Sequence, residues 1–223
     1  NVRSCRGGGI HETLAGGSLA RKSGLDPGFC LCGGGCKISI RMPSLIIGLV
    51  GQAGCGKGTA ADFLQKEYGA GYVRFSAILG SILDALALEK SREEFIRISE
   101  VLRKEFGEDV LSHAIARQVL MSDKDIIVID GIRRLEDIVA FEPLPQFALV
   151  AIDAPAELRF ERMKKRGEKA TESTMTWEQF QHEEDAPTER TIPEVMARAT
   201  VTFDNSGTQE ALIEKIKAFM QNR

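Results

Sequence analysis

The sequence lacks any apolar run long enough to cross a membrane. A spanning helix needs about 18 or more consecutive apolar residues. The longest runs here, Leu45 to Val50 and Ile126 to Ile129, have the length of β-strands. The 223 residues, 43% hydrophobic and 27% charged, have the composition of a globular protein. We therefore expect a cytoplasmic protein with one folded domain, a monomer or homodimer, that does not bind a membrane.

Most of the chain also lacks the basic surplus of a nucleic-acid-binding protein. The net charge is −3. Residues 1–41 hold six basic and two acidic residues, and the remainder holds 23 basic and 30 acidic ones. An acidic body is unsuited to a nucleic-acid backbone, so we expect no nucleic-acid partner. If this body binds phosphates, it must use a few placed cations and backbone amides.

Cysteine is scarce after Met42, the residue that precedes the first convincing strand. Four of the five cysteines and ten of the 22 glycines come before it, in a stretch without helical or strand periodicity. We interpret residues 1–41 as a disordered or non-native tail, either upstream sequence or a fusion scar. Cys30, Cys32 and Cys36 raise the alternative of a zinc site, although their spacing differs from the paired knuckles of structural zinc.

Apolar runs of strand length alternate with amphipathic helical patterns from Leu45 onward, which is typical of parallel β/α construction. We expect a three-layer α/β fold with a parallel five-stranded sheet over residues 42–223. Ser91 and Thr176, each followed three residues later by Glu or Gln, predict helix starts. The predicted strands are Leu45–Val50, Gly71–Phe75, Asp125–Asp130, Phe147–Ile152 and Thr200–Phe203.

A glycine-rich loop, GQAGCGKGT at residues 51–59, lies between the first predicted strand and a helical stretch. Glycines let the backbone wrap closely around a polyphosphate and aim its N–H groups inward. The following helix directs its positive end at the same anion. Lys57 would reach the β- and γ-phosphates, and the Thr59 hydroxyl would face Mg²⁺. The loop residues expected to bind the nucleotide are Gly51, Gly54, Cys55, Gly56, Lys57, Gly58 and Thr59.

The strict phosphate-loop pattern has Ser or Thr directly after the lysine, whereas Gly58 intervenes here. The sequence G-K-G-T instead resembles the loop of adenylate kinases and related P-loop nucleoside monophosphate kinases, including dephospho-CoA-kinase-like and archaeal-type small nucleotide kinases. The resemblance runs from about Ser44 to the C-terminus. It implies a P-loop NTPase fold with ATP and Mg²⁺ as cofactors, an acceptor-binding helical flap near residues 76–110 and a lid near residues 165–190.

The segment DGIRR at residues 130–134 follows an apolar run that ends at Ile129. Asp130 is therefore expected at the carboxyl end of a core strand, where α/β proteins bind ligands. The segment resembles the D-G-x-x-R segment of adenylate kinases. The resemblance implies that Asp130 holds Mg²⁺ through water and that Arg133 or Arg134 grips an acceptor phosphate. The alternative is an Asp-Gly turn with solvated arginines.

Three further residues, Ser76, Arg92 and Arg103, fall in the stretch that caps the acceptor in these kinases. The two arginines are eleven residues apart, so both can face the same side of a helix. The resemblance implies that these residues bind the acceptor. Taken alone, arginines with glutamates nearby are as typical of solvated ion pairs.

Arg159, Arg162 and Arg166 recur at i, i+3 and i+7 in the helix predicted after Ile152, so one face carries all three. Similar kinases have lid arginines here, which implies that Arg162 and Arg166 close on the transferring phosphoryl group; Arg159 is the weaker candidate. A salt-bridged surface helix is the alternative. Asn205 follows the last predicted strand, and a loop of this kind lies beside the adenine in related kinases, so the resemblance implies that Asn205 lies there. A helix cap is the alternative, and it is compatible with adenine contact.

Together these residues predict a kinase that transfers the γ-phosphate of ATP to a small phosphorylated acceptor, a nucleoside or deoxynucleoside monophosphate. The expected catalytic residues are Lys57, Asp130, Arg162 and Arg166. No side-chain nucleophile is needed, because such catalysis is positioning plus charge neutralisation. Two alternatives stay open: a dephospho-CoA-kinase-like enzyme, and a nucleotide-binding regulatory protein without phosphotransfer. The sequence has no N-K-x-D motif of the kind that a GTP switch would show.

Overall fold

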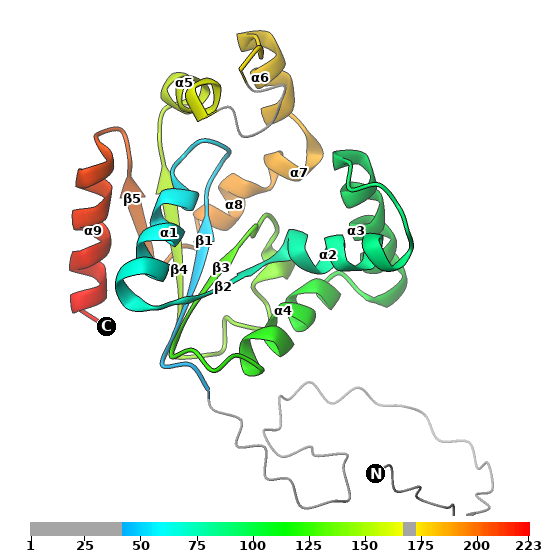
Figure 1. The fold of residues 1–223 in the computed structure, drawn as a ribbon, viewed down its shortest axis with the longest axis horizontal. Coiled ribbons are helices and arrows are strands. Elements are labelled where there is room, and N and C mark those ends of the chain that lie inside the picture. The colour runs from blue at the N-terminus through cyan, green and yellow to red at the C-terminus, as the bar shows by residue number, and fades with distance from the viewer. Residues whose placement is uncertain (1–41, 167–172) are drawn as a thin grey trace, which may run out of the picture. The chain divides into compact units, whose positions relative to one another are not determined.

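The computed structural model describes residues 42–166 and 173–223, whose arrangement Figure 1 shows. The predictions for residues 1–41, including the tail and the zinc alternative, lie outside the described residues. So does the part of the predicted lid at residues 167–172. None of the helices within the two described segments is long and apolar enough to cross a membrane.

Five parallel strands form one sheet in the order β2-β3-β1-β4-β5, which confirms the predicted five-stranded parallel sheet. Each predicted strand boundary agrees with the structure to within one residue. The second strand ends one residue earlier than predicted because Phe75 begins a helix. The strands are β1 (Leu45–Val50), β2 (Gly71–Arg74), β3 (Ile126–Asp130), β4 (Phe147–Asp153) and β5 (Val201–Asp204).

Helices fill the connections between the strands. The predicted helix starts are confirmed: Ser91 Oγ accepts from Glu94 N at 3.3 Å, and Thr176 and Gln179 cap each other reciprocally. The helices are α1 (Lys57–Tyr68), α2 (Phe75–Ala85), α3 (Arg92–Phe106), α4 (Val110–Leu120), η1 (Leu135–Asp137), α5 (Ala156–Arg166), α6 (Trp177–Glu184), α7 (Pro187–Arg190), α8 (Ile192–Met196) and α9 (Gln209–Gln221).

The central strand β1 is buried along its whole length because helices cover both faces of the sheet. On one face of the sheet, Leu45, Ile47 and Leu49 pack with α1 and α9. On the other face, Ile46 and Val50 pack with α2, α4 and α8. In Figure 1, α1 and α9 lie side by side, and the two helices are in contact. Continuous apolar strands are what a parallel sheet with two covered faces requires.

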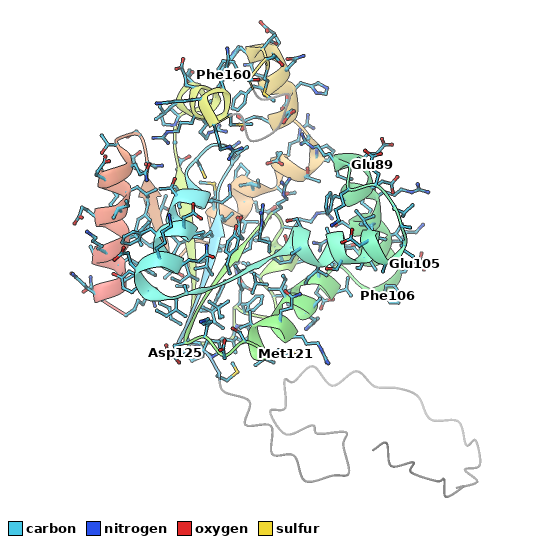
Figure 2. All side chains as sticks on the ribbon, viewed as in Figure 1. Glu89, Glu105, Phe106, Met121, Asp125 and Phe160 are labelled. Atoms are coloured by element: carbon cyan, nitrogen blue, oxygen red, sulfur yellow. The ribbon has the colours of Figure 1, made fainter. Side chains whose placement is uncertain are left out.

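The carboxyl ends of the five strands meet at one edge of the sheet because all the strands are parallel. The glycine-rich loop, the start of α2, the DGIRR segment, the start of α5 and the loop at Asn205 each follow one of these ends. In Figure 2, Phe160 of α5 marks this end of the fold, and Asp125 and Met121 mark the opposite end. The topology thus brings the predicted site residues toward one region.

Candidate functional site

The glycine-rich loop between β1 and α1 allows the backbone alone to surround an anion. Gly54 and Gly56 have φ angles of 77° and 111°, in the left-handed region that favours glycine. A Cβ at Gly54 would lie 2.6 Å from the Arg159 carbonyl oxygen, and a Cβ at Gly56 would lie 2.4 Å from Asn205 Nδ2. Neighbouring segments therefore pack directly against the loop, and only glycine fits at these two positions.

Lys57 begins α1 and folds its ammonium group back over the loop. Its Nζ donates to the carbonyl oxygens of Gly51 at 2.6 Å and Gln52 at 3.1 Å. In the described chain no side chain caps the first amides of α1, which follows Gly56. The positive end of the helix dipole is therefore available to an anion. The lysine and the helix end supply positive charge from adjacent parts of the chain.

Side chains from two other segments hold carbonyl groups of the loop. Arg159 Nη1 donates to Ala53 O at 3.3 Å, and Asn205 Nδ2 donates to Cys55 O at 2.8 Å. The C=O and N–H of a trans peptide point in opposite directions, so the amides of the two following glycines face away from these side chains. Within residues 42–166 and 173–223, no oxygen accepts a hydrogen bond from either amide. Such unpaired N–H groups form a nest that suits phosphate.

Asp130 ends β3 with a carboxylate that is held from two sides. Its Oδ1 accepts from Gly131 N at 2.7 Å, and its Oδ2 accepts from the Tyr72 hydroxyl at 2.6 Å, with Arg74 Nε 3.8 Å away. Burial, followed by the hydrogen bond to Asp130, raises the pKa of Tyr72 above its ordinary value of 10.0, so the phenol remains a donor. Each carboxylate oxygen keeps a second lone pair for water or a cation.

Two arginines from separate elements converge on one carboxylate oxygen. Arg133, in the loop after β3, donates through Nη1 to Glu189 Oε1, and Arg92 Nη2 lies 4.0 Å from the same oxygen. Arg92 Nη1 also pairs with Glu183 Oε2 at 3.0 Å. The Arg133 and Arg92 side chains are 47% and 44% exposed, whereas Glu189 is buried. An anion in place of this oxygen would contact both guanidinium groups.

A cleft of about 450 Å³ lies between the start of α3 and the α6–α7 segment. Arg92 lines one part of it, and His182, Glu183 and Arg190 line another. Pockets for small molecules usually have volumes of roughly 300–1,000 Å³. The volume of the cleft lies within this range.

Arg103 of α3 is 5% exposed, and its guanidinium group binds protein partners. Nη2 donates to Asp137 Oδ1 at 2.5 Å, and Nη1 donates to Glu108 O. Asp137 Oδ2 in turn accepts from the amides of Arg133 and Arg134 at 2.9 and 3.0 Å. Arg103 thus supports, through Asp137, the loop that presents the Arg133 side chain.

The three arginines of α5 lie in different environments. Arg159 is buried and pairs through both terminal nitrogens with Glu184, the last residue of α6. Arg162 reaches the loop after β5, where Nη2 donates to Gly207 O at 3.0 Å. Its Nη1 is buried without an acceptor among the described residues. Arg166, at the end of α5, is exposed.

A small apolar cluster, distinct from the two clusters that cover the sheet, holds α6 against α5. Met163 and Phe160 of α5 pack there with Trp177 and Phe180 of α6. Trp177 stacks on Phe180 with ring centroids 5.3 Å apart. The position of α6 therefore depends on this cluster and on the pair between Arg159 and Glu184.

A family profile described as an AAA domain matches residues 50–181, which is more than half of the chain. The chain belongs to this AAA domain family. The match includes the glycine-rich loop, Asp130 and the three arginines of α5. It confirms the prediction of a P-loop family made from the loop sequence.

Relatives of this AAA domain include the UPF0200 protein of Thermococcus gammatolerans. It is 29% identical over 182 residues, which cover 79% of this chain and 94% of the relative. A UPF0200 protein of Methanocaldococcus jannaschii is 30% identical over 138 residues, which cover 61% of this chain and 68% of the relative.

Two solved structures have a similar fold. TT1252 from Thermus thermophilus matches with a TM-score of 0.52 at 22% identity, over 82% of this chain and 98% of that protein. A shikimate kinase from Bacteroides thetaiotaomicron matches with a TM-score of 0.53 at 10% identity, over 79% and 97%. These likenesses confirm the predicted fold class for the AAA domain.

The predicted nucleotide-binding residues of the AAA domain lie together around the loop. Asn205 contacts the backbone of Cys55, so it braces the loop, and its predicted contact with adenine stays a prediction. Cys55 is 1% exposed with Sγ 3.7 Å from Lys57 Nζ. Its amide donates to Gln52 O at 3.3 Å and its carbonyl oxygen accepts from Asn205, so its role as a nucleotide ligand stays a prediction. Gly58 is exposed, and the Thr59 side chain is half-buried on α1.

The predicted acceptor residues of the AAA domain are divided between two environments. Arg133 and Arg92 converge at Glu189, as two ligands of one anion would. Ser76 is exposed near the start of α2, directly after β2. Arg103 lies in the other environment. Its ion pair with Asp137 is buried, so its guanidinium group has no exposed donor that could bind the acceptor substrate. We therefore correct its role from a phosphate ligand to a support of the Arg133 loop.

Sequence reasoning did not assign partners to four residues that organise the site: Tyr72, Asp137, Glu184 and Glu189. The three acids lie in polar segments with other acids, and nothing in the chain indicates which arginine each one meets. Tyr72 lies two residues before Arg74, the residue that β2 places opposite Asp130. The register of β2 against β3 would have placed Tyr72 near Asp130, but this register was not predicted from the sequence.

Proposed function

We propose that this AAA domain is an ATP-dependent phosphotransferase that moves the γ-phosphate to a small phosphorylated acceptor, a nucleoside or deoxynucleoside monophosphate. The observation that supports the proposal is that two separate parts of the fold gather donor groups of the kind that bind anions. One is the phosphate loop after β1, and the other is the pair Arg133 and Arg92. A nucleotide-binding regulator needs the first place only, whereas a kinase for a phosphorylated acceptor needs both.

The phosphate loop suits the triphosphate of ATP. The unpaired amides of Gly54 and Gly56 and the Lys57 ammonium group would bind phosphoryl oxygens. Thr59 and Asp130 would hold Mg²⁺, which when bound supplies positive charge to the phosphoryl oxygens. Among the described residues, no group of three or more His, Cys, Asp or Glu side chains is arranged for a metal.

The acceptor's phosphate would bind Arg133 and Arg92 in place of Glu189. Both guanidinium groups are partly exposed and reach the same oxygen atom, so one phosphate could accept hydrogen bonds from both. The cleft beside Arg92 would hold the rest of the acceptor. The Arg103–Asp137 pair would keep the Arg133 loop in position.

Transfer would depend on positioning rather than on a covalent intermediate. The phosphorus–oxygen bond to the ADP leaving group would break while an acceptor phosphate oxygen forms the new bond in line. Arg162 and Arg166 would neutralise the charge on the transferring group. Arg162 Nη1, buried without an acceptor among the described residues, is a donor that suits this task. Closure of the α6 segment would exclude water, because hydrolysis competes with transfer.

The test is ADP release from ATP·Mg²⁺ by the full chain, with and without nucleoside monophosphates, deoxynucleotides and dephospho-CoA. We expect one acceptor to stimulate release strongly. Arg133→Ala should raise the KM of that acceptor by roughly 10- to 100-fold, because it removes charged hydrogen bonds, and leave the KM of ATP unchanged. The matched control is Arg97→Ala, a 74% exposed arginine of α3. ATP binding without stimulation by any acceptor would favour the regulatory protein.

A further inference from the structure

The fold buries a cation, Arg159, directly against the phosphate loop. The residue is 3% exposed, yet each guanidinium nitrogen has an acceptor. Nε donates to Ala154 O at 3.0 Å, Nη1 donates to Ala53 O at 3.3 Å, and Nη2 donates to Glu184 Oε2 at 2.8 Å. Nη1 also pairs with Glu184 Oε1. A bidentate buried pair of this kind has one defined geometry.

This guanidinium group joins three segments of the chain. Ala53 belongs to the phosphate loop, Ala154 directly follows β4, and Glu184 ends α6. The apolar cluster around Phe180 already packs α6 on α5, and Arg159 lies 5.5 Å from the centre of that ring. If the only role of Arg159 were to attach α6 to α5, it would not need a hydrogen bond to the phosphate loop.

The bond to Ala53 O determines how one peptide of the loop is oriented. Ala53 is followed by Gly54, which has a φ of 77°, and a peptide next to glycine can turn over at little steric cost. When Arg159 holds the Ala53 carbonyl, the Gly54 N–H must point the opposite way. Among the described residues, no oxygen accepts a hydrogen bond from that amide.

We propose that the Arg159–Glu184 pair positions the phosphate loop. It holds the Ala53–Gly54 peptide in the orientation that binds phosphate, and it couples this orientation to the docking of α6. The inference rests on the proposed nucleotide site and adds two positioning residues to it, neither of which touches the phosphates. Because linkage is reciprocal, phosphate binding and the docking of α6 each favour the other.

The test is the binding of inorganic tripolyphosphate to the full chain by isothermal titration calorimetry, with Trp177 emission as a second readout. Trp177 is the single tryptophan of the sequence and stacks on Phe180 in α6, so its emission reports the docking of that helix. The wild type should bind tripolyphosphate with a change in emission. Gln181→Ala, an exposed substitution on the same helix, should behave like the wild type.

The decisive variant is the double substitution Arg159→Met with Glu184→Met. Apolar side chains of similar length often replace a buried ion pair without loss of stability, but methionine cannot donate to Ala53 O. We expect the double variant to keep a Tm close to that of the wild type, to bind tripolyphosphate about tenfold more weakly, and to lose the change in Trp177 emission.

Equal affinity of the wild type and the double variant would overturn the inference, since the pair would then only pack α6 onto α5. If the double variant does not fold, Glu184→Gln is judged by the same comparison of affinity and emission. The outcome is separable from that of the proposed function. A loss of tripolyphosphate affinity supports the positioning role even if the wild type transfers phosphate to no acceptor.

Discussion

Removing the charge of Asp137 should destabilise the whole domain, because its partner Arg103 would remain buried and unpaired. The two side chains are 5% and 3% exposed, with Nη2 and Oδ1 2.5 Å apart. Loss of one partner from a buried ion pair costs about 3–5 kcal/mol. The asparagine side chain can still accept hydrogen bonds from the amides of Arg133 and Arg134. Asp137→Asn therefore removes the charge and keeps these hydrogen bonds. For a chain of this size, that free energy corresponds to a fall in Tm of about 6–20 °C.

The assay is thermal unfolding followed by circular dichroism, completed as a double-mutant cycle with Arg103→Met. We expect the double variant to lose less stability than the two single variants together, by about 2 kcal/mol, because the second substitution removes a charge that is already unpaired. Arg198→Met is the matched control, since its pair with Glu142 at 2.9 Å is exposed and such pairs contribute little. The reasoning is refuted if Asp137→Asn lowers Tm no more than this control.

Three further predictions concern the site. Lys57→Ala should abolish phosphotransfer with little change in Tm, and transfer at the wild-type rate would contradict the role of the phosphate loop. Glu189→Gln removes the carboxylate that pairs with Arg133, so the acceptor KM should fall several-fold; a higher KM in initial-rate assays would make Glu189 part of the acceptor site. In a Tyr68→Phe background, phenolate absorbance should show Tyr72 ionising above pH 10.0. Because the unfolded tyrosine ionises first, stability should fall as the pH rises past this value. Ionisation at the ordinary pKa would contradict the burial of Tyr72 and its hydrogen bond to Asp130.

The strands could be predicted from the sequence because a parallel sheet covered on both faces produces continuous apolar runs. Leu45–Val50 is such a run, and every residue in it is buried. The end of β2 shows the limit of the pattern. Phe75 is apolar and continues the run, yet it begins α2. The order of the strands was not predicted, because side-chain patterning does not determine which strands are neighbours.

The phosphate loop could be predicted because its chemistry is local: nine consecutive residues provide the backbone amides, the lysine and the start of the helix. The partners of the arginines could not be predicted in this way, because they lie far from the arginines in the sequence. Arg133 meets a carboxylate 56 positions away, and Arg159 meets one 25 positions away. Arg103 was assigned to the acceptor because the resemblance places it in the stretch that caps the acceptor, but its burial against Asp137 depends on tertiary packing.

The central claim, that the chain transfers phosphate to a small phosphorylated acceptor, is tested most directly by following the label from [γ-³²P]ATP. The full chain and its Lys57→Ala variant would be incubated with each candidate acceptor, and the products separated by chromatography. The account predicts that the label moves to one acceptor with the wild type and to none with the variant. Label found only as inorganic phosphate, or equal transfer by both proteins, would contradict it.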